Sequence, residues 1–255
     1  MNRAFTLGGL AVAFAATAAM SGSAATARDS SARRFQAPVT APPVRLTQAD
    51  VDASNAKVSM AYGALVDMWT KDFQTIGERF APPRVARYRQ AFLSACGVMQ
   101  TDNAAYCPND NTIYFDDVFV AGLEKQASAA LGTDGDMAGL GVIAHEMGHA
   151  VAMQLGYDAP SPYENEAVAD CLAGAFAEQS KRDGSLEKGD EQEAFFGMAS
   201  AGDPTPQLTG NRRVDRFILA RAAAMGHGTR EQRMENFSAG LHGGAGACLD
   251  AFSGL

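Results

Sequence analysis

The segment from Ala138 to Leu155 is apolar, rich in alanine and followed by Gly156, a pattern typical of a buried helix. It contains two histidines four residues apart, in His145-Glu146-Met147-Gly148-His149. Residues at this spacing lie on one face of a helix, roughly 5–6 Å apart, so both imidazoles can reach a single metal ion. The chain must therefore fold around a core helix that carries metal-binding groups.

Glu146 projects beside the face formed by the two histidines. There it can contact a water molecule on the metal without binding the metal itself, which is the position that a general base requires. The HExxH pattern alone can arise by chance, but here it lies inside a helical pattern and uses two of the four histidines in the chain. The alternative is that His145 and His149 are ordinary helix histidines.

A third ligand is available in a second helix, which we expect to open at Glu166 and run on through Leu172 and Phe176. If Glu166 faces the metal, Asp170 lies one turn further on and can accept a hydrogen bond from a ligating imidazole. Glu164 is the competing ligand, but it has no carboxylate one turn further on. Three protein ligands leave one position for water, as in catalytic zinc sites. We therefore predict one Zn²⁺ ion on His145, His149 and Glu166.

The first 27 residues carry one cation, Arg3, then an apolar run from Ala4 to Met20, and then small residues. This order is typical of a secretory signal peptide that is removed from the mature chain. An uncleaved anchor helix is the alternative, because the run is at the short end for a membrane span. In either case we expect the domain outside the cytoplasm, periplasmic or secreted, and membrane-bound only if the segment stays uncleaved.

Residues 28–46 are rich in Pro, Ala and Ser, which predicts a tether, and residues 47–255 are expected to form the main domain. With 47% hydrophobic residues, the chain of 255 residues can build one sizeable core or two small ones, and one main domain is the expectation. The net charge is -8, and the basic pairs are isolated rather than clustered. This balance argues against binding to nucleic acid.

The four cysteines are an even set, and none stands in a CxxC pair. In an oxidising compartment this favours two disulfides over a cysteine-ligated zinc site. Three pairings are open. Joining Cys96 to Cys107 closes a short loop and leaves Cys171 with Cys248, which we take as the predicted pairing.

The pattern after the tether predicts a long amphipathic helix that begins with a cap formed by Thr47 and Asp50. Its apolar side chains recur at spacings of three and four, at Val58, Tyr62, Leu65, Trp69 and Phe73. A second helix is expected after Pro82-Pro83, ending before Cys96, and further helices over Asp117–Leu131 and Asn211–Met225.

Thr112-Ile113-Tyr114-Phe115 is β-branched and aromatic, which makes it the best strand candidate in the chain. The strand is short, and we expect it at a sheet edge. The expected fold is α+β, mainly helical, with a small β-sheet.

Several further blocks of sequence occur in order along the chain. They are Ser94–Gly97, Tyr106–Pro108, Ile113–Asp116, Val142–Glu146, Ala169–Gly174, and His227–Thr229 with Gln232, Arg233, Phe237, Gly240 and Cys248. With these blocks the chain resembles the putative neutral zinc metallopeptidase family of bacteria, which is gluzincin-like, over about Gln48 to Phe252. Ala150 differs from the family, which usually has another histidine directly after the second ligand.

The resemblance implies a zincin-like metalloprotease domain, a hydrolase that cleaves the peptide bonds of a peptide or protein substrate. The residues allow this independently, because zinc would lower the pKa of its water to about 7 and Glu146 would take the proton. The predicted edge strand Thr112–Phe115 would pair with an extended substrate. His227 is the first candidate for an oxyanion donor, with Tyr157 and Tyr163 as others, and helix capping is its structural alternative.

Two other functions remain open. One is a non-catalytic zinc-binding scaffold or assembly factor of the cell envelope, and the other is a hydrolase of non-protein amides such as those of the cell wall. Glu146 favours an enzyme over a scaffold, because a non-catalytic protein has no chemical need for a carboxylate at that position.

Overall fold

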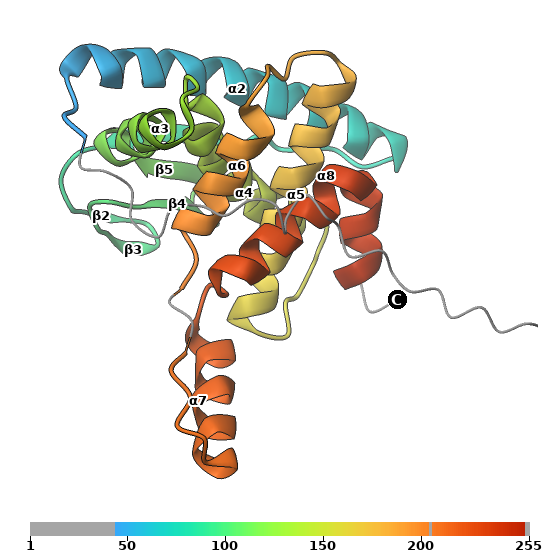
Figure 1. Ribbon diagram of the computed structural model, residues 1–255. Helices are drawn as coiled ribbons and strands as arrows, with labels where there is room; N and C mark the ends of the chain where they lie inside the picture. Colours follow the sequence, from blue (N-terminus) through green and yellow to red (C-terminus); the bar gives the residue numbers. More distant parts are fainter. Residues whose placement is uncertain (1–43, 204–205, 253–255) are drawn as a thin grey trace, which may run out of the picture.

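The computed structural model describes residues 44–203 and 206–252 (Figure 1). The predicted signal peptide, residues 1–27, and most of the predicted tether, residues 28–43, lie outside the described residues. Within the described ranges, no helix combines the length and the apolar character needed to cross a membrane. The architecture is α+β and mainly helical, as the sequence predicted.

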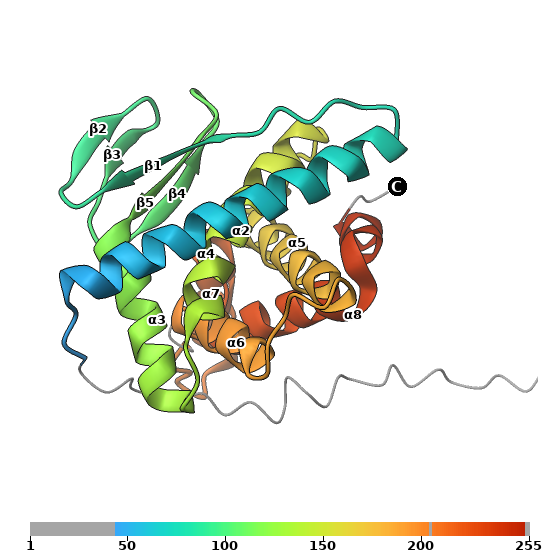
Figure 2. The same ribbon diagram turned by 90° about the horizontal axis from the view of Figure 1, so that it is seen from above.

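Helix α2 (Gln48–Thr75) begins with the predicted cap and lies along one side of the molecule (Figure 2). The Thr47 side chain accepts a hydrogen bond from the Asp50 backbone N–H, and the Asp50 carboxylate accepts one from the Thr47 backbone N–H at 2.8 Å. The apolar face of the helix, which includes Leu65, Trp69 and Phe73, is buried in the core. α2 packs on α3 (Asp117–Leu131) and α4 (Asp136–Gln154).

The predicted helix after Pro82-Pro83 is wrong, because this part of the chain forms strands. β1 (Arg84–Tyr88) lies here, followed by the hairpin of β2 (Phe92–Ser94) and β3 (Gly97–Met99). β1 pairs in parallel with β5 (Thr112–Asp116) along its whole length, from Arg84 opposite Thr112 to Tyr88 opposite Asp116. A distant pairing partner thus overrides the local helical preference.

The strand at Thr112–Phe115 exists, but its predicted place at a sheet edge is wrong. It forms β5, which lies in the middle of the order β1-β5-β4, and β4 (Ala104–Cys107) is antiparallel to it. The buried side chains of Ile113 and Phe115 explain the β-branched and aromatic composition, since a central strand is covered by neighbours. β4 is therefore the edge strand next to the helices.

Helix α4 carries the HExxH segment and is buried along most of its length. It packs against α5 (Pro162–Arg182) and α6 (Asp190–Ser200), and α5 in turn packs against α8 (Arg230–Phe252; Figure 2). Glycines allow these helices to approach closely. A Cβ on Gly148 would lie 2.8 Å from the carbonyl oxygen of Ala169, and one on Gly240 would collide with the carbonyl oxygen of Cys171.

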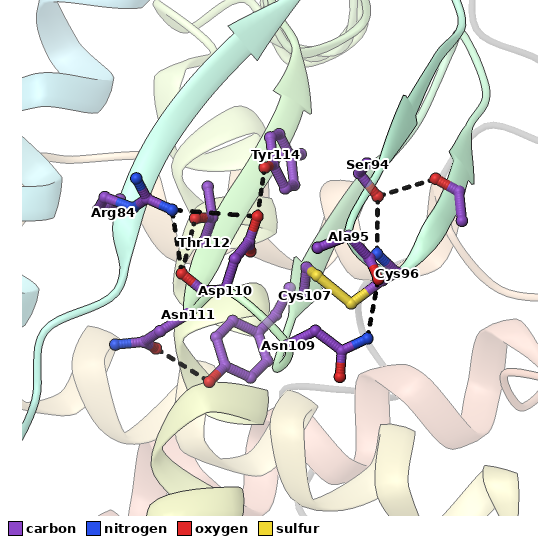
Figure 3. Close-up of a disulfide and its surroundings, with 12 residues drawn as sticks. Arg84, Ser94, Ala95, Cys96, Cys107, Asn109, Asp110, Asn111, Thr112 and Tyr114 are labelled. Atoms are coloured by element: carbon purple, nitrogen blue, oxygen red, sulfur yellow. Dashed lines mark hydrogen bonds and ion pairs between the residues drawn. A yellow bond between two sulfur atoms is a disulfide. The ribbon is translucent and has the colours of Figure 1, made fainter.

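Two disulfides join Cys96 to Cys107 and Cys171 to Cys248, the pairing that the sequence favoured. The first ties the turn between β2 and β3 to the end of β4, where Asn109 also donates a hydrogen bond to the Ala95 carbonyl (Figure 3). The second is buried between α5 and α8. Two disulfides are consistent with an oxidising, extracytoplasmic location.

Helix α7 (Arg212–Met225) covers the predicted helical stretch and projects away from the other helices (Figure 1). Asn211 caps it, since its side-chain oxygen accepts hydrogen bonds from the backbone of Arg213 and Val214. Large apolar side chains such as Phe217 and Leu219 are exposed on it. α7 therefore adds little to the core.

Candidate metal centre

The structure brings His145, His149 and Glu166 together between α4 and α5, each offering a donor atom within 4.8 Å of the others. The two imidazole Nε2 atoms are 3.2 Å apart. Glu166 reaches them from α5, with Oε2 at 3.2 Å from the His145 Nε2 and Oε1 at 3.5 Å from the His149 Nε2. The helical spacing of four residues places the histidines one turn apart on α4.

These separations fit a zinc ion. In a tetrahedral site with bonds of about 2.0–2.1 Å, neighbouring ligand atoms are roughly 3.3 Å apart, close to the three observed distances. Two imidazoles and one carboxylate are also the donor set of one class of catalytic zinc sites. The donor set is thus pre-arranged for one ion, with the fourth direction free to face a pocket.

Glu146 lies beside these donors but is not one of them. Its Oε2 atom accepts a hydrogen bond of 2.8 Å from the backbone N–H of Tyr106, so edge strand β4 holds the carboxylate in place. The side chain is buried, and this burial raises the pKa of Glu146 above its ordinary value. A carboxylate with a raised pKa is better suited to accept a proton near neutral pH.

Asp170 is completely buried one turn after Glu166, and its Oδ1 lies 2.9 Å from the Nδ1 of His145. Arg233, from α8, binds the same carboxylate through Nη2 at 2.6 Å and Nε at 3.1 Å. The Nη1 of Arg233 donates to the carbonyl of Ala201 at the end of α6. Asp170 therefore links a histidine on α4 to helices α5 and α8.

The electrostatics of the donors suit a metal ion. Burial, aided by the charge of His145, lowers the pKa of His149 to about 4, so its ring is neutral near pH 7. Burial and Arg233 act to lower the pKa of His145, but Asp170 and Glu166 outweigh them and raise it to about 9. The His145 ring therefore carries an additional proton near pH 7. A metal ion that binds to this ring would displace that proton.

Glu166 is ionised over the whole physiological range. Burial acts to raise its pKa, but the hydrogen bond and the charge of His145, with His149, lower it to about 2. Glu164, the competing candidate, is not among these donors, and its carboxylate accepts a hydrogen bond from the Ser161 hydroxyl at the start of α5. The structure therefore brings Glu166, and not Glu164, to the histidines.

A pocket of about 1000 Å³ opens onto the donors. It is bordered by edge strand β4, by the loop between α4 and α5, and by the end of α6, and its lining includes Glu146 and Arg233. The expected substrate strand, β5, does not take this position, because β4 lies between β5 and the pocket edge. β4 is thus the strand whose backbone faces the site.

His227 lines the same pocket but lies near its mouth. Its side chain is 64% exposed, and its Nδ1 is 3.7 Å from Asp203. It does not cap α8, because the Thr229 side chain accepts the hydrogen bond from the Gln232 backbone at the start of that helix. Of the two tyrosines considered, Tyr157 lines the pocket, whereas the Tyr163 ring lies against Gly228.

Among the described residues, three to which the sequence assigned no role contact the centre. They are the guanidinium of Arg233, the backbone N–H of Tyr106 and the side chain of Asn165, which lies 3.3 Å from the Nδ1 of His149. Arg233 and Tyr106 do occur in the sequence blocks that carried the family resemblance. Their place in these blocks could have marked them as candidate site residues. Asn165 gave no signal, but it directly precedes Glu166.

Comparisons with known proteins identify the family of this chain. The family model described as "Putative neutral zinc metallopeptidase" matches residues 6–161 and 162–252. The uncharacterized protein YpfJ of Escherichia coli K12 is 32% identical over 204 residues, which cover 73% of this chain and 67% of the relative. The uncharacterized protein Mb2605 of Mycobacterium bovis is 30% identical over 183 residues, 63% of this chain and 59% of the relative.

No solved structure matches the chain significantly. The family model nevertheless spans both the segment that carries the histidines and the segment that carries Glu166, Asp170 and Arg233. The chain therefore belongs to the family of putative neutral zinc metallopeptidases.

Proposed function

We propose that the protein is a zinc-dependent peptidase that hydrolyses peptide bonds in a peptide or protein substrate. One Zn²⁺ ion would be held by His145, His149 and Glu166. When bound, zinc supplies a Lewis acid that makes water acidic near neutral pH and polarises the carbonyl to be attacked. The observation that carries the proposal is Glu146, a buried carboxylate at the pocket that lies beside the donor set and is held by Tyr106.

Glu146 would act as the general base. Its carboxylate accepts a proton from the attacking water and then returns it to the nitrogen of the leaving amine, so that one group serves both steps. The hydrogen bond from the Tyr106 backbone fixes Oε2, which leaves Oε1 to meet the water. A scaffold that only binds zinc has no need for this arrangement.

Asp170 and Arg233 would act as positioning residues. The carboxylate of Asp170 holds the Nδ1 side of His145, which directs Nε2 toward the other donors. Arg233 places a positive charge directly against the fully buried Asp170 carboxylate.

β4 supports binding of an extended substrate. The Tyr106 N–H points away from β5 toward Glu146, and residues two apart in a strand point the same way, so the backbone of Ala104 also faces outward. An extended peptide would pair with the outward-facing backbone of Ala104, since the Tyr106 N–H is already bound to Glu146. His227, at the pocket mouth, remains our candidate for a donor to the oxyanion.

We further propose that the protein works outside the cytoplasm, in the periplasm or as a secreted protein. The N-terminal sequence and the two disulfides support this location.

The test is cleavage of a diverse peptide library by the zinc-loaded protein, read by mass spectrometry. Glu146→Gln should lower cleavage by about 10²–10⁴-fold while zinc content stays at one ion per chain. Glu166→Gln should instead lose bound zinc. Glu164→Gln is the matched control and should cleave at the unchanged rate, because Glu164 pairs with Ser161 outside the donor set.

Two results would contradict the proposal. Full cleavage by Glu146→Gln would show that this carboxylate is not the base. No cleavage by zinc-loaded protein would favour the zinc-binding scaffold, or a hydrolase of cell-wall amides if such amides are cleaved instead.

A further inference from the structure

A second group of carboxylates lies at the other end of α4 from the histidines. Asp134 and Asp136 flank the start of this helix, and Asp190 and Glu193 lie in the first turn of α6. Each of the four offers an oxygen, and these oxygens all lie within 4.8 Å of one another. We call these four residues the acidic cluster. Asp136 precedes His145 by nine residues, roughly 13 Å along the helix, so the two groups are separate.

The cluster is formed by two turns that come unusually close to their neighbours. Gly135 has a φ of 86°, and a Cβ at this position would collide with the carbonyl oxygen of Glu124. Gly189 has a φ of 119°, and a Cβ there would lie 2.5 Å from the Thr133 side chain. Both positions favour glycine for conformation and for space. The fold thus brings the four carboxylates together by special backbone geometry.

The environment of the Glu193 carboxylate points to a bound ligand. Its side chain is 0% exposed. Oε2 accepts a hydrogen bond of 3.0 Å from the Met137 backbone, whereas Oε1 is buried and, among the described residues, has no hydrogen-bond partner. A buried carboxylate oxygen without a partner is costly, and native proteins rarely leave one in that state. A bound cation would satisfy this oxygen.

The charges of the cluster are incompletely balanced by the protein. Among the described residues, one cation, Lys57, forms ion pairs with two of the four carboxylates. Its Nζ lies 2.9 Å from Asp134 and 2.8 Å from Asp136. Asp190 has a pKa raised to about 6, because of its burial and the charges of Asp136, Glu193 and Asp134. The two buried members, Asp190 and Glu193, are thus left without a cation of their own.

We propose that the acidic cluster is a binding site for a Ca²⁺ ion that joins the start of α4 to the start of α6. All the donors are carboxylate oxygens, the ligands that Ca²⁺ prefers, and the cluster offers no imidazole or thiolate for zinc. Two oxygens bound to one Ca²⁺ ion are at most about 4.8 Å apart, since each bond is about 2.4 Å. The four oxygens all lie within this distance of one another, so each can reach the same ion.

The test is thermal unfolding of the full chain, with both disulfides formed and with metal ions first removed by chelation. At a Ca²⁺ concentration about 100 times its Kd, we expect the Tm to rise by roughly 5–10 °C. Mg²⁺ at the same concentration serves as the control for ionic strength, because it demands shorter bonds and a stricter geometry. Calorimetric titration should give one Ca²⁺ ion per chain.

Glu193→Gln should abolish the Ca²⁺ shift, because the amide cannot replace a charged ligand. Glu191→Gln is the matched control: Glu191 is in the same turn of α6 but pairs with Lys181, so its variant should keep the full shift. Lys57→Gln should have the opposite effect and strengthen Ca²⁺ binding. Removing the competing ammonium should lower the Ca²⁺ concentration for half of the shift several-fold, an effect that a folding defect cannot mimic.

The Ca²⁺ site would be overturned by the absence of any Tm shift at millimolar Ca²⁺, or by an equal shift with Mg²⁺. It would also be overturned if Glu193→Gln folded and kept the full shift. Glu166→Gln, which alters the donors of the other centre, should respond to Ca²⁺ like the unchanged protein, so the result does not depend on the proposed peptidase.

Discussion

The donor set with Asp170 and Arg233 lies where α4 meets α5, and the acidic cluster lies where the start of α4 meets α6. Both contain buried carboxylates, but their charges are balanced differently. Around the histidines, Asp170 has the guanidinium of Arg233, and Glu166 has two imidazoles within 3.5 Å. In the acidic cluster, Lys57 contacts the two more exposed aspartates, and one oxygen of Glu193 has no partner among the described residues. The protein thus supplies positive partners for the carboxylates of the first centre, whereas Asp190 and Glu193 in the second have no cationic partner among the described residues.

The largest expected effect on stability comes from breaking the balance in the first centre. Arg233→Met removes the guanidinium partner of the fully buried Asp170 and leaves only the His145 imidazole beside it, which should lower the free energy of unfolding by about 3–5 kcal/mol. Urea unfolding measures this. The double variant Arg233→Met/Asp170→Asn should recover much of the loss, because it removes the unpaired charge as well. A single variant as stable as the unchanged protein would mean that Asp170 does not need its partner.

A smaller, pH-dependent effect is expected beside the acidic cluster, at Glu124 on α3. Burial raises the pKa of Glu124 to about 7, with Asp136 and Asp134 adding to the effect. Because the folded pKa exceeds the unfolded value near 4.5, the stability that this group contributes is fully present below pH 4.5 and is lost as the pH rises through 7. Glu124→Gln should therefore stabilise the protein by ~3 kcal/mol at pH 8 and by little at pH 4.

The Glu124 prediction is checked by denaturant unfolding at the two pH values. The amide introduced by Glu124→Gln keeps an oxygen for the hydrogen bond that Ser54 donates to Glu124 at 2.9 Å, so the comparison isolates the charge. Glu78→Gln, at an exposed position, is the control and should change stability equally at both pH values. A stabilisation by Glu124→Gln that is the same at pH 4 and pH 8 would refute the assigned cause.

The smallest effect on stability is expected for an ion pair that is exposed to solvent. Lys181 lies 2.7 Å from Glu191, and its side chain is 58% exposed. Lys181→Ala should change the free energy of unfolding by less than about 0.5 kcal/mol, because solvent screens such a pair. Repeating the measurement in about 1 M NaCl should remove even this difference. A loss above about 2 kcal/mol would mean that burial is not what separates the strong pairs from the weak ones.

The histidine centre could be predicted from the sequence to the extent that it depends on helical periodicity. The spacing from His145 to His149, and from Glu166 to Asp170, is one turn, so each pair shares a face wherever the helix packs. The cap at Thr47 is equally local. Arg233 could not be found this way, because its contact to Asp170 spans 63 residues and depends on how α8 packs on α5.

The errors in the sheet have the same origin. Whether Arg84–Tyr88 is strand or helix is decided by β5, whose paired residues lie 28 positions further along the chain. Whether Thr112–Asp116 is central or at an edge depends on having partners on both sides, β1 and β4. The residues of β5 do not indicate which strands pair with it. Composition therefore identified β5 as a strand but not its position within the sheet.

The contact between α5 and α8 also has a consequence for biosynthesis. A ribosome adding about 5–20 residues per second needs roughly 3–13 s to extend the chain from Asp170 to Arg233. During that interval the nascent chain already contains both histidines and Glu166, but the guanidinium that neutralises Asp170 has not been made. The centre can therefore be completed only after most of the chain has been synthesised.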